Sequence, residues 1–122
     1  MEDIQLQKIM KIIDKEITIQ ELRKMAQETF GNMVKAVVDV KREIMAVDAE
    51  LHADEEAYLL ENGSAQRDLW GINLYPAVSG ADFIEFDSMI NLRPAQGNRS
   101  RGVEDAKTQE KIRLIVSTLV TR

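Results

Sequence analysis

The chain has 122 residues, with 16 lysines and arginines against 21 acids and a formal net charge of -5. This length fits a single domain over residues 1–122, and the apolar fraction of 44% is that of a globular protein. With no cysteine, disulfides, thiolate metal sites and cysteine nucleophiles are excluded. No apolar run approaches the roughly 18 residues that cross a bilayer, and the acidic start is no secretory signal. We therefore expect a cytoplasmic protein with no membrane partner.

Two elements are predicted before residue 31. Residues 8–14 are apolar enough for a short strand, although residues 1–13 also allow a helix. Residues 1–7 are expected to form a flexible or extended segment. Thr18 and Glu21 have the spacing of a capping box, in which the threonine hydroxyl accepts from the third helical amide and the glutamate reaches back. The apolar stripe that follows predicts a helix over 19–30.

The middle of the chain predicts a hairpin followed by a helix. Residues 33–51 form two runs rich in valine and isoleucine, separated by Lys41 and Arg42. A hairpin is the simplest interpretation. One long strand, or a helix through the polar break, stays open because the turn has no Asn-Gly or Asp-Gly signal. Residues 53–62 place acids in a first helical turn and end before a glycine, which is typical of a helix.

The second half of the chain predicts two strands and a final helix. Residues 69–75 and 83–92 are interpreted as antiparallel partners joined by a turn-rich segment. Side-chain alternation then places Ile84, Phe86, Ser88, Ile90 and Leu92 on one face of the second strand. The opposite, polar face would carry Glu85, Asp87, Asn91 and Arg93. Asp105 is placed to cap a last helix with an apolar stripe.

Together these elements predict an α+β fold. We expect an antiparallel sheet of about four strands with three helices packed mainly on one face. The residues expected to be buried between the sheet and the helices are Val34, Ala36, Val38, Trp70, Ile72, Ile84, Phe86 and Ile90.

Three runs of the chain resemble a family of small bacterial proteins known as a domain of unknown function. The runs are ELHADEEAYLLENGS, DLWGINLYP and FIEFDSMINLRPAQGNRSRGVED, and the resemblance extends from about Ile17 to the C-terminus. Its most specific parts are INLRP and GNRS. The chain departs from the family pattern at Asp48-Ala49, where glycines are expected, and after Ser100, where a more apolar run is expected. The resemblance implies a compact bacterial intracellular domain, and it brings no activity or catalytic residues.

An arginine-rich loop over residues 93–102 is the first candidate site. Its ligand-binding candidates are Arg93, Asn98, Arg99 and Arg101. The planar guanidinium fork suits phosphate or carboxylate, and the loop leads into a helix N-terminus, which favours anions. Glu104 and Asp105 compete for the same arginines, so a loop fixed by ion pairs within the chain is the alternative interpretation.

Carboxylates supply a second candidate. Asp39, Glu85 and Asp87 would share a sheet face if the hairpins pair in one sheet, and carboxylates clustered around Mg²⁺ activate water for phosphodiester cleavage. Alternating charges are equally typical of a solvated sheet face. His52, the single histidine, stands before a run of acids that suits a metal or acid–base pair, although the helix dipole alone explains acids there.

Two functions follow as hypotheses. The preferred one is a non-catalytic binding or interaction module whose polar strand face and arginine loop engage a small anionic ligand or a second copy of the chain. The alternative is a metal-dependent, phosphate-directed hydrolase or nuclease that uses the clustered carboxylates. No cofactor is expected for the preferred function. The net charge of -5 argues against general nucleic-acid binding.

Overall fold

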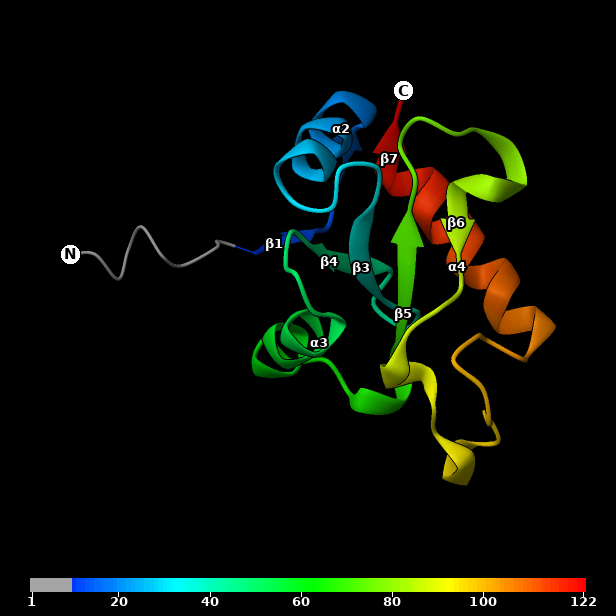
Figure 1. Ribbon diagram of the computed structural model, residues 1–122. Coiled ribbons are helices and arrows are strands. Elements are labelled where there is room, and N and C mark those ends of the chain that lie inside the picture. The colour runs from blue at the N-terminus through cyan, green and yellow to red at the C-terminus, as the bar shows by residue number, and fades with distance from the viewer. Residues whose placement is uncertain (1–9) are drawn as a thin grey trace.

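The computed structural model describes residues 10–122, which form an α+β fold around a five-stranded antiparallel sheet (Figure 1). The strand order is β1-β4-β3-β5-β6, with bounds β1 Lys11–Ile13, β3 Val34–Asp39, β4 Ile44–Val47, β5 Leu69–Leu74 and β6 Ile84–Glu85. A separate parallel pair joins β2 (Ile17–Thr18) to β7 (Val120–Thr121). The helices are α2 (Ile19–Glu28), α3 (His52–Glu61) and α4 (Ala106–Leu119). The predicted segment 1–7 lies outside the described residues.

Local capping explains where the helices begin. In α2 the Thr18 hydroxyl accepts from the Glu21 amide at 3.1 Å, and a Glu21 carboxylate oxygen accepts from the Thr18 amide at 3.0 Å. This is the predicted capping box, which satisfies two amides that the helix itself leaves unpaired. Asp105 caps α4 in the predicted way by accepting from the Thr108 amide at 2.9 Å.

The predicted hairpin of residues 33–51 is confirmed as β3 and β4. A side chain rather than a glycine pair stabilises its turn, because the buried Asp39 carboxylate accepts from the backbone amides of Lys41 and Arg42, each at 2.9 Å. Glu43 closes the turn with a positive φ of 61°. An aspartate that satisfies the amides of its own turn replaces the Asn-Gly signal that the sequence lacks.

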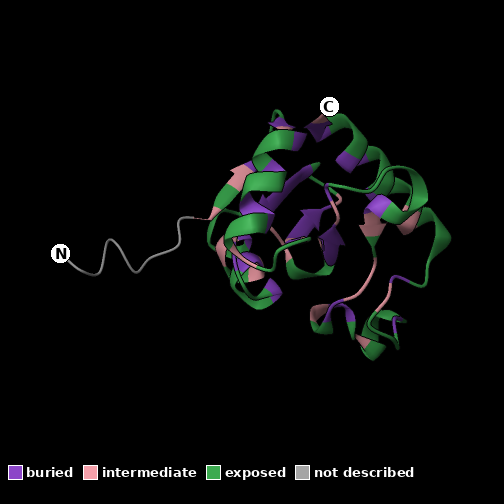
Figure 2. Cartoon of the chain, turned by 45° about the horizontal axis from the view of Figure 1, so that its top comes forward, coloured by how far each residue is buried: buried purple, intermediate pink, exposed green. Residues whose placement is uncertain are grey.

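Helices cover both faces of the sheet, with two on one face and one on the other. The main core joins α2 and α4 to strand residues such as Val38 and Ile72, whereas Leu59 of α3 packs on the opposite face against Val37 and Leu69. Figure 2 shows the buried strands between helices whose outer surfaces are exposed. The α+β prediction is confirmed, and α3 is the helix that lies apart from the other two. In residues 10–122 no helix is long and apolar enough to cross a membrane.

The strand predicted over residues 83–92 is much shorter than expected. Only Ile84 and Glu85 pair with β5, and the chain then leaves the sheet and forms a 3₁₀ turn over Met89–Asn91. The Ser88 hydroxyl caps this turn by accepting from the Ile90 amide at 3.3 Å.

The predicted faces therefore fail beyond Phe86. Phe86 packs on the main core, but Ile90 packs with the α3 cluster on the other side of the sheet. Asn91 is fully buried although it was assigned to the polar face, and Leu92 is 43% exposed although it was assigned to the core face. Alternation holds only while a chain stays extended, and the 3₁₀ turn ends that condition.

Candidate functional site

A polar cleft opens where α3 stops covering its face of the sheet. Val37 and Leu69 lie under α3, and the same face continues past Gly71, the partner of Val37, to the directly paired Lys35 and Asn73. The cleft has a volume of about 520 Å³. Its polar lining residues are Lys35, His52, Asn73, Tyr75, Glu85, Asp87, Ser88 and Arg101. The cleft is therefore the continuation of a helix-covered face beyond the end of its helix.

Asn73, Tyr75 and Glu85 form a hydrogen-bonded group at one side of the cleft. Asn73 and Glu85 are cross-strand partners, and the Asn73 amide nitrogen donates to a Glu85 carboxylate oxygen at 2.9 Å. The Tyr75 hydroxyl donates to the same oxygen at 2.8 Å. This hydrogen bond raises the pKa of Tyr75, because the carboxylate stabilises the protonated phenol.

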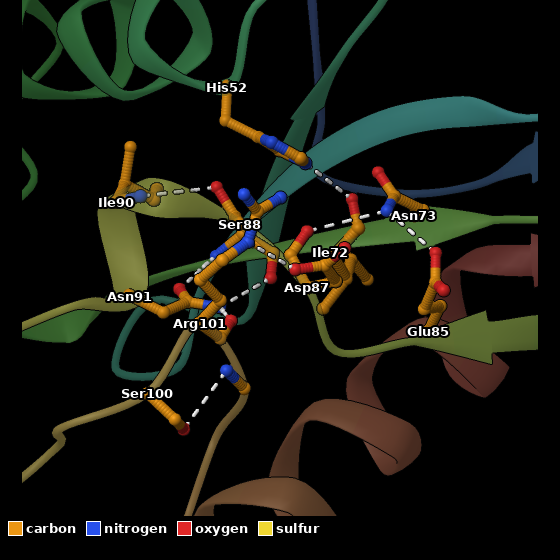
Figure 3. Close-up of polar contacts among 12 residues, drawn as sticks. His52, Ile72, Asn73, Glu85, Asp87, Ser88, Ile90, Asn91, Ser100 and Arg101 are labelled. Atoms are coloured by element: carbon orange, nitrogen blue, oxygen red, sulfur yellow. Dashed lines mark hydrogen bonds and ion pairs between the residues drawn. The ribbon is translucent and has the colours of Figure 1, made fainter.

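The orientation of the Asn73 amide follows from its partners. Its nitrogen faces two acceptors, the Glu85 carboxylate and the Asp87 backbone carbonyl at 3.3 Å, so the amide oxygen must point the other way (Figure 3). Asn73 is 5% exposed, and within residues 10–122 its amide oxygen has no hydrogen-bond partner. A buried acceptor without a donor lowers the stability of the fold.

Arg101 and Asp87 form an ion pair at the other side of the cleft. The Arg101 Nε atom lies 2.6 Å from a carboxylate oxygen of Asp87, and the side chains are 54% and 41% exposed, respectively (Figure 3). Such an exposed pair adds little stability by itself. The backbone instead fixes Arg101, because its carbonyl oxygen accepts from the Ser88 amide and from the Asn91 side chain, each at 2.9 Å.

His52 stands at the first position of α3, between the helix and the sheet. Its Nε2 atom lies 2.8 Å from the Ile72 carbonyl oxygen, which only accepts, so Nε2 carries the proton and Nδ1 is the acceptor in the neutral ring. Burial lowers the pKa of His52 and favours this neutral form. Leu51 precedes it at the N-cap and makes no side-chain cap, so the positive end of α3 lies at the cleft without a side-chain acceptor.

Gly71 is the point at which the walls of the cleft meet. A Cβ atom added at this residue would lie 2.5 Å from the Ser88 Cβ and 3.2 Å from a ring carbon of His52, so no larger residue fits without movement. The Asn91 side chain pairs with both backbone groups of Gly71, at 2.8 and 3.0 Å. This side chain takes the place of a strand along the edge of β5 where β6 has already ended.

The sequence profile of one protein family matches residues 11–119, and its description is "Protein of unknown function (DUF5674)". The chain belongs to this family. The match covers nearly the whole chain and includes every residue of the cleft. No curated protein matches the chain, and no solved structure does.

The two most specific parts of the resemblance to the DUF5674 family hold the loop in place. INLRP contains Asn91, and GNRS contains Asn98, a predicted ligand-binding residue that is 4% exposed. The Asn98 amide nitrogen donates to the backbone carbonyls of Asn91, Ser100 and Gly102 at 2.7, 3.1 and 2.8 Å. Its amide oxygen accepts from the Glu104 amide at 2.9 Å. The structure therefore places Asn98 in the support of the loop, outside the lining of the cleft.

Arg93 and Arg99, two of the three arginines in the loop, also lie outside the cleft lining. Arg93 donates to the backbone carbonyls of Gln66 and Leu69, and its guanidinium carbon lies 4.3 Å from the centre of the Trp70 ring. Burial lowers the pKa of Arg93. Arg99 has an exposed side chain, and its backbone amide donates to Glu104 at 2.9 Å. Of the predicted ligand-binding residues, Arg101 is the one that the structure brings to the cleft.

The three predicted metal-ligating carboxylates do not come together. Glu85 and Asp87 line the cleft, but Asp39 pairs with Leu69, which lies roughly 13 Å along β5 from the partner of Glu85 at 3.3 Å per residue. Both oxygens of Asp39 are engaged, one by the hairpin turn and one by the Ser64 hydroxyl at 2.7 Å. Among residues 10–122 no group of three histidines or acids is placed to hold a metal ion. The metal-dependent alternative stays a prediction.

Four polar lining residues of the DUF5674 cleft belong to no site predicted from the sequence: Lys35, Asn73, Tyr75 and Ser88, which was assigned to the core face. A signal for them existed in the strands. Asn73 is polar at an inward position of the otherwise apolar run LWGINL, and Lys35 interrupts the run VKAVVD in the same way. Polar residues on strand positions that should be buried indicate either a satisfied network or a site.

Proposed function

We propose that the protein is a non-catalytic binding module that holds a small anionic ligand in the cleft, with Arg101 as the main contact. The observation that carries this proposal is the geometry of the Arg101–Asp87 pair. The contact uses Nε, so the two terminal nitrogens of the guanidinium have no partner among the described residues. A guanidinium presents its terminal nitrogens as a fork that suits phosphate or carboxylate.

Two further positive groups support an anion at this place. Lys35 lines the cleft, and its ammonium group lies 5.0 Å from the centre of the Phe30 ring, in a weak contact that a bound anion can replace. Leu51, His52 and Ala53 bring the N-terminal end of α3 to the cleft, where the helix dipole favours negative charge. The anion would therefore meet Arg101, Lys35 and the start of α3.

A titration followed by ¹⁵N–¹H NMR tests the proposal, with inorganic phosphate as the probe. We expect saturable shifts of the backbone amides of Ala53, Asn73 and Arg101, and weaker binding as salt rises. Arg101→Gln should abolish these shifts, whereas Arg99→Gln should preserve them, because Arg99 belongs to the same loop but lies outside the cleft lining. Equal loss in the two variants, or shifts that do not saturate, would contradict a specific anion site in the cleft.

We also propose that the protein works in the bacterial cytoplasm and that it self-associates. The location is carried over from the sequence expectation, and fractionation of bacterial cells that express the chain tests it. Self-association is supported by Leu114, which is 64% exposed on the outer face of α4. Sedimentation velocity should show a concentration-dependent dimer that Leu114→Lys disrupts, and a monomer at all concentrations would refute it.

A further inference from the structure

We infer that a second pocket, separate from the cleft, binds a small carboxylic acid with an apolar body. This pocket lies between α4 and residues 80–84, the segment that leads into β6, and we call it the α4 pocket (Figure 1). The inference is independent of the proposed anion site, because the α4 pocket and the cleft share no lining residue. The α4 pocket has a volume of about 480 Å³. This size is typical of sites for small molecules, which are mostly apolar with a few polar groups.

Apolar side chains form the inside of the α4 pocket. Phe83, Val116 of α4 and Val120 of β7 line it, and all three belong to the main core. Ile84 of β6 also lines it and packs against the same core. Because core packing fixes these side chains, the apolar surface is in place before a ligand binds. Each CH₂ group that a ligand buries on this surface should raise the affinity by up to about fourfold.

Two arginines that line the α4 pocket are held over aromatic rings. The guanidinium carbon of Arg113 lies 5.0 Å from the centre of the Phe86 ring, and that of Arg122 lies 4.8 Å from the centre of the Phe83 ring. The face of an aromatic ring attracts a cation, and it leaves the N–H donors at the edge of the guanidinium available. Each ring therefore positions a cation beside the pocket without neutralising it.

The charge of these two arginines is not compensated within residues 10–122. No acid of this part of the chain lines the α4 pocket, and neither guanidinium forms an ion pair there. Arg113 donates from Nη1 to the Gln109 amide oxygen at 3.5 Å, a neutral acceptor. Uncompensated positive charge beside an apolar pocket, in a chain with a net charge of -5, attracts a negative group on a ligand.

The apolar surface and the arginines together define the chemistry of the ligand. A carboxylate suits the planar fork of a guanidinium, and an alkyl chain suits the apolar side chains below it. Inorganic phosphate would gain nothing from the apolar surface, and an uncharged apolar molecule would gain nothing from the arginines. An alkyl carboxylate is the simplest molecule that uses both.

Three small molecules test the inference on the full chain by isothermal titration calorimetry. Butanoate has the charge of octanoate with a shorter chain, and 1-octanol has a chain of equal length without the charge. We expect octanoate to bind about tenfold or more tightly than either. In ¹⁵N–¹H NMR spectra, octanoate should shift the backbone amides of Ile84, Ser117 and Val120 and leave those of Asn73 and Arg101 unchanged.

These measurements separate the α4 pocket from the cleft. Octanoate that binds no more tightly than butanoate or 1-octanol, or that shifts the cleft amides instead, would overturn the inference. Phosphate binding in the cleft is read from Ala53, Asn73 and Arg101, so either proposal can fail while the other stands.

Variants at exposed positions assign the binding to the α4 pocket. Arg113→Gln should weaken octanoate binding by about fivefold or more and leave 1-octanol unaffected, whereas Arg99→Gln removes the same charge outside the pocket and should change neither. Ser117→Trp places a large side chain in the lining and should abolish octanoate binding. Thr118→Trp, at the next position of α4 and outside this lining, should preserve it. Binding that survives Ser117→Trp, or that the two arginine variants weaken equally, would refute the site.

Discussion

Replacing Gly71 by alanine should destabilise the fold strongly, because the added methyl group has no space. Its carbon would lie 2.5 Å from the Ser88 Cβ and 2.6 Å from the Ser88 hydroxyl oxygen, closer than nonbonded atoms approach. Relief requires the 88–91 turn to move away from β5, which also breaks the paired hydrogen bonds between Asn91 and the backbone of Gly71. Overpacking costs about 1–3 kcal/mol and each of the two lost hydrogen bonds costs about 1 kcal/mol, so we expect a loss of about 3–5 kcal/mol.

Urea unfolding followed by circular dichroism measures this loss. Gly102→Ala is the matched control, because a Cβ at Gly102 would meet its nearest atom, the Phe86 carbonyl oxygen, at 3.4 Å. The control should change the free energy of unfolding by less than about 1 kcal/mol. Ser88→Gly should restore part of the stability of Gly71→Ala, which a double-mutant cycle would detect as coupling. A Gly71→Ala protein as stable as the wild type, or one that Ser88→Gly does not improve, would refute the contact between β5 and the turn.

Three further predictions concern buried polar groups. Asn91→Ala should lower the free energy of unfolding by about 2–4 kcal/mol, because it leaves buried backbone groups of Gly71 unpaired. Asn32 is exposed, so Asn32→Ala should have almost no effect. Equal losses of the two variants in urea unfolding would contradict the role of Asn91. Burial raises the pKa of Glu55 well above 4.5, so the stability that its protonated form contributes is full below that value and is lost as pH rises through the raised pKa. Urea midpoints measured across this range should fall less steeply in Glu55→Gln, and parallel curves would show that Glu55 is not the cause. The pKa of His52 should lie below 6.5 in the folded protein, so stability should fall as pH drops from 6.5 through the lowered pKa. The ring protons of this single histidine report the pKa in an NMR titration. A titration midpoint at or above 6.5 would refute the burial of His52 as a neutral ring.

Elements determined by short-range chemistry could be predicted from the sequence. The start of α2 was placed by Thr18 and Glu21, which are three residues apart, and the start of α4 was placed by Asp105, which accepts from the amide three residues further on. The segment after Phe86 could not be predicted in this way, because the Asn91 side chain pairs with Gly71, twenty residues away. Alternation of apolar residues predicts an extended strand there. This pattern carries no information about a distant side chain that pairs with β5 in place of a strand.

Only part of the candidate site could be predicted from the sequence, and the physical reason is related. An arginine or asparagine has the same donors whether it binds a ligand or a backbone carbonyl of its own chain. Arg93 and Asn98 use theirs on carbonyls such as those of Gln66 and Asn91, whereas Arg101 extends to the cleft. The residue types in the loop were informative, but the division between supporting and ligand-facing groups depends on where the carbonyls lie. That information is held by tertiary structure.

The small parallel pair of β2 and β7 has a consequence for the order of folding. Its partners, Ile17 with Val120 and Thr18 with Thr121, lie about a hundred residues apart in the chain. Closing a loop of that length costs about 4 kcal/mol of chain entropy, and two short strands cannot repay it alone. The pair must therefore form after the sheet and α4 have brought the ends together. On the ribosome, the strand position beside Ile17 stays empty until Val120 and Thr121 have emerged.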